Sequence, residues 1–524
     1  MRKTYDFCVI GAGVAGLGVA IPLAEGGKRV VVLDRDNPRL DGLDRFRPRA
    51  AASFKNAGIV QLGLLTDIRA YFTDETERLY LNMGVDVRSR GAVQPTTSLW
   101  ECAALELTPL SATDPPASLP LAPTARGLFA FPAGSNAEPE RAMRTIRARV
   151  AQLGRHIDLV CGVEVRSMRW TGGEKRGGEG STTSPRTTTE VQEDDECGDL
   201  DVWVVYTSVG TFRAHELVVA AGPGSKELLA TLGIQLPMVH IYGIMGESTP
   251  LKSYGGERED YRRGNKGNSE TVKDNKENDV RNKDVRSSDY KDSSNTDAAK
   301  CNSYNGTSLP PPFFDGTIIA ADAEIQWYMR DAFQRLMCGC GGRPSLVREH
   351  VHFTAMWDGG HRLKHLYRHL YAAAQVRNGE RRLALGGPRV ELPSEMGVRD
   401  FDGLRADAFD DEWRVCVQYL CRLVELPAGV RFDPARRWGG VMAFPADEGG
   451  PFVGTVEGCY GHTLHLSTGY ESSGFRQAFG GGRFLAHLLL YGDEWADAEG
   501  ARDVRCAKWR NLAPTRRRRV VFDW

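Results

Sequence analysis

Blocks of apolar residues separated by glycines open the chain and predict a strand, a turn, a helix and a second strand. Residues 6–10 are an apolar run that leads directly into the glycine-rich residues 11–16. A helix of small residues follows, and residues 29–34 form a second apolar run. Short apolar runs bounded by turn residues are typical of strands buried on both faces.

The same block pattern recurs along the chain. Residues 137–154 are amphipathic with Pro139 in the first turn, where proline favours helix entry. Further predicted strands are 158–165, 203–207, 216–222 and 463–467, and further predicted helices are 226–232, 411–424 and 474–490. Strands that alternate with helices and end in glycine turns predict an α/β fold with a doubly wound sheet. Residues 314–424 mix strands with a helical pattern and predict a second domain.

Two segments lack any hydrophobic period. Residues 171–199 are rich in Gly, Thr, Glu and Ser, and residues 252–311 are dense in Lys, Asp, Asn, Ser and Arg. Neither segment can bury enough apolar surface to offset the entropy of ordering, so both are predicted to be disordered insertions. Without them a core of roughly 430 residues remains, which is the size of a two-domain enzyme.

Composition excludes several classes of protein. The chain has 524 residues, 41% of them hydrophobic, and a net charge of -1, which argues against a general binder of nucleic acid. The arginines at 516–519 are a local exception, and we interpret residues 511–524 as a solvated basic tail.

The spacing of cysteines and histidines bears on metal binding, and the length of apolar runs bears on cellular location. Cys338 and Cys340 have no second pair at metal-ligand spacing, and His350 and His352 have no carboxylate at matching spacing, so we predict no metal site. The N-terminus shows no apolar signal-peptide core, and no apolar run is long enough to span a bilayer. We therefore expect an intracellular protein of the cytoplasm, with an organelle or peripheral membrane association left open.

The opening strand, turn and helix have the residues of a dinucleotide-binding turn. Gly11 permits the tight turn, Gly13 lets a pyrophosphate approach the backbone, and Gly16 allows close packing of helix on sheet. Asp34 closes the second strand, about 20 residues on, where an acidic side chain accepts hydrogen bonds from a ribose. The predicted nucleotide-binding residues here are Gly11, Gly13, Val14, Ala15, Gly16, Asp34 and Arg35.

Further motifs follow in a fixed order over most of the predicted core. They are Ser53-Phe54-Lys55-Asn56-Ala57-Gly58, Glu138-Pro139, Gly162-Val163-Glu164-Val165, Val219-Ala220-Ala221-Gly222, Trp438-Gly439-Gly440 with Pro445, Asp447 and Pro451, and Gly469-Tyr470-Glu471-Ser472-Ser473-Gly474. The ordered set resembles the D-amino acid oxidase/glycine oxidase superfamily of FAD enzymes, most of all its D-amino acid dehydrogenase and sarcosine oxidase branches. The resemblance implies that FAD is bound by Ser53, Asn56, Ala57, Gly58, Val165, Ala221, Gly222, Gly439, Gly469, Ser472, Ser473 and Gly474.

The resemblance also implies a domain organisation. A Rossmann-like FAD-binding domain is discontinuous in sequence, and a substrate domain with an antiparallel sheet is inserted into it, so that the chain is α+β overall. The expected FAD-binding parts are 1–62, 136–235 and 437–510, and the expected substrate-domain parts are 63–135 and 236–436.

Two departures from the family pattern matter. Covalent sarcosine oxidases carry a flavin-tethering cysteine where this chain has Gly439-Gly440-Val441, so we predict a non-covalently held FAD. The terminal turn of the family often carries a histidine, and Tyr470 and Ser473 occupy that neighbourhood here.

Three side chains are candidates for the catalytic site. Arg476 matches a lysine that binds the substrate carboxylate in the sarcosine oxidase branch, although a structural salt bridge is an equally good interpretation. Lys55 lies on the expected flavin-facing loop, where it would bind the carboxylate, aid oxygen reactivity or simply be solvated. Tyr242 would line a roof over the flavin, or else pack in the core.

These features predict an FAD-dependent oxidoreductase that oxidises the C–N bond of a D-amino acid or N-methyl amino acid to an imine by hydride transfer to FAD. One alternative is a 2-hydroxy acid or glycerol phosphate dehydrogenase on the same fold. Another is a non-enzymatic flavoprotein that acts as an assembly factor. The electron acceptor, oxygen or a quinone or carrier, and the oligomeric state are not fixed by the sequence.

Overall fold

The computed structural model describes residues 3–36, 52–56, 58–61, 68–89, 92–95, 108–109, 128–131, 134–172, 201–251, 318–321, 354–356, 362–365, 370–377, 380–423, 426, 429–446, 451–456 and 463–502. Residues 252–310 lie outside this set. Also outside it are most of the first predicted insertion, the basic tail, Ala57, Asp447, and the cysteines and histidines at 338, 340, 350 and 352.

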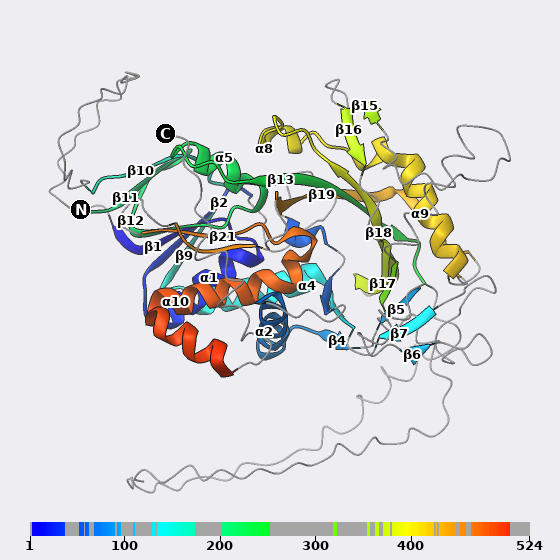
Figure 1. Cartoon of the computed structure of the whole chain (residues 1–524), viewed down its shortest axis with the longest axis horizontal. Helices are drawn as coiled ribbons and strands as arrows, with labels where there is room; N and C mark the ends of the chain where they lie inside the picture. Colours follow the sequence, from blue (N-terminus) through cyan, green and yellow to red (C-terminus); the bar gives the residue numbers. More distant parts are fainter. Residues whose placement is uncertain are drawn as a thin grey trace, which may run out of the picture. The chain divides into compact units, whose positions relative to one another are not determined.

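The first sheet is built around parallel strands at the N-terminus. Its order is β10-β11-β12-β1-β2-β9, with β21 beside β12 and β20 beside β21 (Figure 1). The strands are β1 (Thr4–Ile10), β2 (Val30–Asp34), β9 (Ile157–Cys161), β10 (Val165–Trp170), β11 (Trp203–Thr207), β12 (Gly210–Val219), β20 (Phe452–Thr455) and β21 (Leu464–Thr468). Strands β1, β2, β9, β12 and β21 run parallel, whereas β10, β11 and β20 pair antiparallel with their neighbours.

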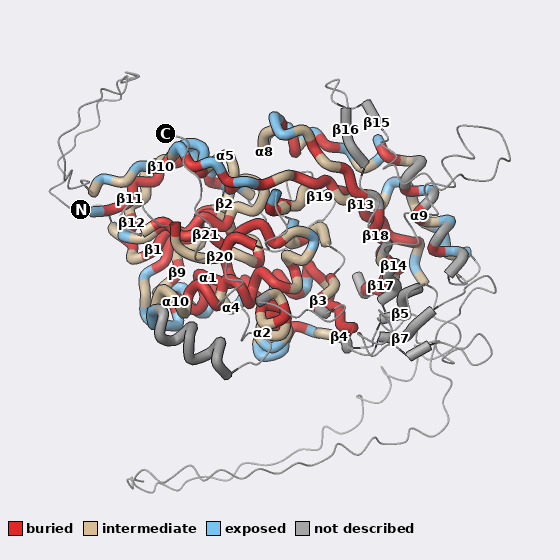
Figure 2. The backbone as a smooth tube through the Cα atoms, viewed as in Figure 1, coloured by how far each residue is buried: buried red, intermediate tan, exposed pale blue. Residues whose placement is uncertain are grey.

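Helices cover this sheet and bury its apolar strands. They are α1 (Val14–Glu25), α2 (Ile68–Asn82), α4 (Pro139–Gln152), α5 (Ser225–Ala230) and α10 (Gly474–Arg502), which is kinked at Gly492. Helix α1 packs between the sheet and α10, and α10 packs on α2, so α1 is buried almost all round (Figure 2). This burial explains why α1 consists of small and aliphatic residues with no polar face.

The second sheet is mostly antiparallel. Its order is β15-β16-β18-β17-β14-β5-β7-β6, with β13 joining β18 to β19. The strands are β5 (Ala92–Pro95), β6 (Thr108–Pro109), β7 (Leu128–Phe131), β13 (Met238–Ser248), β14 (Ile318–Ala321), β15 (Thr354–Met356), β16 (Arg362–His365), β17 (Leu370–Arg377), β18 (Glu380–Glu391) and β19 (Phe432–Pro445). Helices α8 (Val398–Phe401) and α9 (Asp410–Leu423), with the 3-10 turn η5 (Ala406–Phe409) between them, follow β18.

A third, small sheet has the order β3-β8-β4, with β3 (Ile59–Gln61), β4 (Val87–Ser89) and β8 (Ser135–Ala137). Strand β3 touches both α2 and α10. Three 3-10 turns complete the described elements: η2 (Ala52–Phe54), η3 (Gly222–Gly224) and η7 (Glu471–Ser473). Among the described helices none is long and apolar enough to cross a membrane.

One predicted element is wrong in detail. Residues 158–165 were expected to form a single strand, but β9 ends at Cys161 and β10 begins at Val165. Gly162 has φ +75°, a turn conformation that breaks the strand, and the two halves take different partners, β2 and β11.

Candidate functional site

The glycine turn after β1 is closed by backbone contacts. Gly11 has φ +107°, and its amide donates to the Leu33 carbonyl at 2.7 Å. A Cβ on Gly11 would stand 2.4 Å from the Ala220 carbonyl oxygen, and one on Gly16 would stand 1.9 Å from the Gly11 carbonyl oxygen. The tight turn at Gly11 and the close approach of the backbone at Gly16 therefore both require glycine.

The space beside this turn is open where a pyrophosphate is expected. Among the described residues, a Cβ on Gly13 would meet only the Ser53 hydroxyl, at 3.1 Å, and one on Gly222 would meet no atom within 4 Å. The amides in the first turn of α1 have no acceptor within the helix, and the helix dipole places positive charge there. These residues fit the diphosphate of a dinucleotide.

Asp34 braces the turn from the end of β2. Its carboxylate accepts hydrogen bonds from the Ala12 amide and, at 2.8 Å, from the Asp36 amide. Burial raises the pKa of this carboxyl, while the two amides and the guanidinium of Arg147 on α4 oppose the shift. Arg147 was not among the sequence candidates; it also lies 5.4 Å from the centre of the Phe54 ring.

The loop expected to face the flavin is attached to α1 and to β8. The Ser53 hydroxyl accepts from the Val14 amide at 3.0 Å, and the Asn56 side chain donates to the Ser53 carbonyl at 2.6 Å. The Gly58 amide donates to Asn56 Oδ1 at 2.7 Å, and the Gly58 carbonyl accepts from the Ala137 amide at 2.7 Å. The loop is therefore built by the residues that the motif predicted to bind cofactor.

The ends of β12 and β21 are tied together at the same edge of the sheet. The Thr468 hydroxyl donates to the Gly222 carbonyl at 3.1 Å and lies 3.2 Å from the Ser225 hydroxyl. Gly222 follows Ala221 directly, and two residues before Val165 the Val163 amide donates to the Asp34 carbonyl at the end of β2 at 2.9 Å. The carboxyl ends of parallel strands thus gather most of the predicted FAD-binding residues.

The terminal turn precedes α10. Gly469 has φ +75° and Glu471 has φ +56°, a conformation that only a few non-glycine residues adopt. The Ser473 amide donates to the Tyr470 carbonyl at 3.0 Å, Ser472 is exposed, and Gly474 begins the helix. Tyr470 itself points into the core, where its hydroxyl lies 2.9 Å from that of Ser467.

Arg476 lies in the first turn of α10 beside a second arginine. Its Nε is shielded from solvent. Burial lowers the pKa of this guanidinium to about 10; Arg69 on α2 lowers it as well, whereas Glu471 raises it. A buried guanidinium that also feels the positive charge of a second arginine favours a bound anion.

Lys55 joins the flavin-facing loop to the second sheet. The Lys55 carbonyl accepts from Trp438 Nε1 at 3.0 Å, and a Cβ on Gly440 would stand 3.1 Å from Lys55 Cβ. Burial lowers the pKa of Lys55 to about 8, although the carboxylates of Asp402 and Asp36 raise it.

Tyr242 and Gly439 lie on the other face of the second sheet. The Tyr242 hydroxyl donates to the Leu404 carbonyl at 3.4 Å, and its ring packs on Phe409. A Cβ on Gly439 would meet the Tyr242 ring at 2.0 Å, so this glycine makes room for the tyrosine. Tyr242 is therefore packed in the core beside Phe409.

Arg389 and Tyr371 lie on the Lys55 side of the second sheet and were missed from sequence. Arg389 is opposite Gly243, which is opposite Gly440, and directly opposite residues of antiparallel strands point to the same face. Arg389 is 6% exposed and its side chain hydrogen-bonds Tyr371, whose pKa is raised by burial in spite of Arg389. No local pattern marks them, because the pair depends on the register of β17 and β18.

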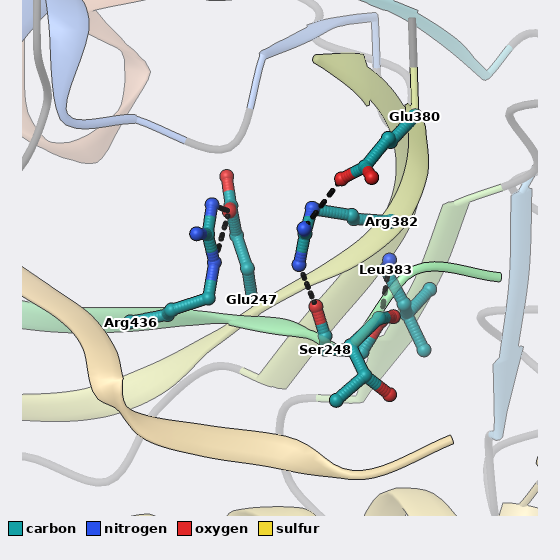
Figure 3. Close-up of polar contacts among 7 residues, drawn as sticks. Glu247, Ser248, Glu380, Arg382, Leu383 and Arg436 are labelled. Atoms are coloured by element: carbon teal, nitrogen blue, oxygen red, sulfur yellow. Dashed lines mark hydrogen bonds and ion pairs between the residues drawn. The ribbon is translucent and has the colours of Figure 1, made fainter. Parts of the chain in front are cut away.

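Other cations on this face are held by carboxylates, as Figure 3 shows. Arg436 Nη2 lies 2.6 Å from the buried Glu247, and Arg382 Nη2 lies 2.5 Å from Glu380. Arg382 also donates to the Ser248 carbonyl at 3.0 Å, which joins β18 to β13. The Arg436–Glu247 ion pair and the Arg382–Ser248 hydrogen bond join β19 and β18 to the far end of β13.

Comparisons with known proteins identify the family. The model of the family described as FAD dependent oxidoreductase (DAO) matches residues 6–276, more than half of the chain. The chain belongs to this family. It is therefore an FAD-dependent oxidoreductase, and the predicted superfamily is confirmed. The comparison with curated proteins found no match.

Solved structures share the fold of this FAD-dependent oxidoreductase. It is similar to glycine oxidase from Geobacillus kaustophilus (TM-score 0.53, 14% identity, covering 93% of this chain and 95% of that one). It is also similar to L-proline dehydrogenase from P. horikoshii (TM-score 0.53, 12% identity, covering 94% of this chain and 95% of that one). A third similar structure is L-amino acid deaminase from Proteus vulgaris (TM-score 0.54, 13% identity, covering 94% of this chain and 95% of that one). The predicted α/β fold with an inserted antiparallel sheet is confirmed.

Within the described part of the chain, no group of three or more His, Cys, Asp and Glu residues is placed to hold a metal ion. The described cysteines lie in β1, β9 and α9, away from the 439–441 segment of β19.

Proposed function

We propose that this chain oxidises the carbon–nitrogen bond of a small amino acid, either a D-amino acid or an N-methyl amino acid, to an imine. The observation that carries the proposal is the shielded guanidinium of Arg476 in the first turn of α10, on which the positive charge of Arg69 also acts. A guanidinium grips a carboxylate with two charge-assisted hydrogen bonds, and a second cation nearby strengthens the grip. The three solved structures named above bear names of proteins that act on amino acids, which supports a substrate of this class.

The residues that would hold FAD fall into two groups. The ADP half would lie on the Gly11–Gly16 turn, with Asp34 toward the ribose and Gly222 beside the diphosphate. The flavin half would lie between the Ser53–Gly58 loop and the terminal turn, where the N-terminus of α10 favours negative charge. FAD supplies the hydride acceptor, and the chain holds and orients the substrate.

We propose the discontinuous domain division predicted from sequence as the frame of this site. The first sheet with its helices would bind the cofactor, and the second sheet would cover the substrate. Tyr371 and Arg389 are then better placed than Tyr242 to contact the substrate, because they share the Lys55 face of the second sheet.

FAD is proposed to be held without a covalent bond. Residues 439–441 carry no cysteine, and the described cysteines lie in other elements. Denaturation of the purified protein with acid should leave the yellow colour in the supernatant. A yellow pellet would contradict non-covalent binding.

Product analysis tests the reaction. With a D-amino acid the protein should release equal amounts of an oxo acid and ammonia, and with an N-methyl amino acid it should release methylamine in place of ammonia. Oxidation of a 2-hydroxy acid alone would favour the dehydrogenase alternative. Bound FAD with no oxidation of either class would favour a non-enzymatic flavoprotein. Omitting oxygen, with and without a quinone, would identify the electron acceptor.

A further inference from the structure

The short connection between β18 and α9 reaches the nucleotide edge of the first sheet. Residues 397–402, here called the α8 segment, contain α8 and its two flanking residues. Asp402 pairs with Arg35 at 3.2 Å, and the Val398 amide donates to the Glu227 carboxylate. Arg399 pairs with Glu164 at 3.3 Å. The α8 segment thus contacts the ends of two strands of the first sheet and helix α5.

Each of these three places adjoins a residue of the predicted nucleotide site. Arg35 directly follows Asp34, Glu164 directly precedes Val165, and Glu227 lies on α5 just after the Gly222 turn. Val398 also contacts this turn, because a Cβ on Gly224 would stand 3.4 Å from Val398 Cγ2. The α8 segment therefore lies along the edge where the ADP half of FAD is expected.

The other side of the α8 segment is fixed to the second sheet. The Phe401 ring packs edge-on against His240 of β13, with centres 4.9 Å apart. His240 Nε2 lies 3.0 Å from the Pro223 carbonyl, and the His240 carbonyl accepts from the Leu392 amide at 2.8 Å. The α8 segment thus packs directly on β13.

Asp402 has a special position among these contacts. Its side chain is 19% exposed, against 86% for Arg399, so its ion pair is the better shielded of the two. Asp402 also acts on Lys55, on the flavin-facing loop, by raising its pKa. One carboxylate therefore stabilises positive charge on both the ribose side and the flavin side of the site.

We propose that the α8 segment is a clamp from the second sheet that closes over the ADP half of FAD and slows its release. This inference rests on the proposed FAD site. In this proposal Asp402 neutralises Arg35, and the Val398 amide holds Glu227 on α5. The two contacts would keep the ends of β2 and β12 at the spacing that the ribose and the diphosphate need. Cofactor retention would then depend on residues of the second sheet that never touch the flavin ring.

The test measures nucleotide binding by the full chain. Asp402→Asn should weaken binding of both FAD and ADP to the cofactor-free protein, each by roughly five- to tenfold, which is the effect expected for loss of a half-buried ion pair. Arg399→Gln should change both by less than about twofold, because its pair is exposed. The matched control is Glu25→Gln. It removes the exposed ion pair between Glu25 on α1 and Arg149 on α4, two helices that pack near the same sheet.

Several outcomes would overturn the clamp. Equal FAD and ADP affinities in wild type and Asp402→Asn would do so, as would weaker FAD binding with unchanged ADP binding, since the effect would then act through Lys55 alone. If wild type binds neither nucleotide, the proposed FAD site itself fails. Should Asp402→Asn fold poorly, hydrogen exchange of the wild-type amides at 397–402 decides: FAD must slow it, and unchanged exchange contradicts the clamp.

Discussion

Arg476 is the residue on which the substrate assignment depends. Replacement by leucine should raise KM for an amino acid by roughly ten- to a hundredfold with a smaller effect on kcat, because a charge-assisted contact to the substrate carboxylate is lost. Arg476→Lys should recover much of the binding. Steady-state kinetics with the oxo acid as readout measures both.

The matched control for Arg476 lies on the same helix. Arg483 also extends from α10 to α2, where it pairs with Glu75. Arg483→Leu should leave KM unchanged even if it lowers stability. An equal rise of KM in both variants would assign Arg476 to helix packing.

His240 should make stability depend on pH. Burial lowers its pKa to about 4, with a further lowering by Lys226, from an ordinary value of 6.5. Between pH 6.5 and 4 the unfolded chain therefore binds a proton at His240 that the folded chain does not. The contribution of His240 to the free energy of unfolding is thus complete above pH 6.5 and is lost as the pH falls toward 4. The loss amounts to up to about 3 kcal/mol.

The measurement for His240 is the free energy of unfolding in denaturant at several pH values, in wild type and His240→Gln. The difference between the two curves should grow in favour of wild type as pH rises from 4 to 6.5. Parallel curves would show that His240 titrates normally in the folded protein.

At the residue scale the sequence predicted what is local. Gly11, Gly16, Ser53 and Asn56 have roles set by neighbours in the chain, and their contacts follow the motif. The pairing of Arg389 with Tyr371 could not be predicted, because β17 and β18 have to be aligned first and β18 carries an irregularity beside Gly243.

At the scale of elements, the crossing of α1 and α10 depends on glycines. A Cβ on Gly482 would stand 2.7 Å from the Ala15 carbonyl oxygen and from Gly18, and backbone atoms cannot move aside cheaply. Gly482→Ala should destabilise the chain by about 1–3 kcal/mol and weaken FAD binding, because it pushes the N-terminus of α1 away. Denaturant unfolding and FAD titration measure the two effects.

Gly474→Ala is the control for that helix. Its Cβ would meet no described atom closer than 3.9 Å, so we expect only helix propensity to change and the protein without FAD to be as stable as wild type or slightly more stable. Equal stability of Gly482→Ala and Gly474→Ala would show that the helices can part without cost.

The type of an element could be predicted where its apolar period was long. Its boundaries could be predicted where a proline or glycine marked the turn. The predicted helix at 137–154 is α4, Pro139–Gln152, with proline at its start. The strand at 158–165 was wrong because Gly162, a turn residue, was included in it. The α8 segment could not be placed from sequence, since its partners are far away in the chain.

At the scale of the whole molecule, residues 252–310 make up almost all of the second polar insertion predicted from sequence. Replacing them with a short Gly/Ser linker should leave FAD content unchanged and stabilise the chain by about 1 kcal/mol, since a shorter loop costs less entropy to close. Absorbance of the purified variant and its denaturant unfolding check this. Loss of FAD would show that the segment takes part in the site.

The proposed oxidation of a carbon–nitrogen bond is tested most directly by anaerobic reduction of the flavin with matched pairs of compounds. Each pair consists of a D-amino or N-methyl amino acid and the 2-hydroxy acid with the same carbon skeleton. We predict that the amino compound bleaches the visible flavin band and that its hydroxy partner does not. Bleaching by the hydroxy acid alone, or by neither compound of any pair, would contradict the proposed oxidation of a carbon–nitrogen bond.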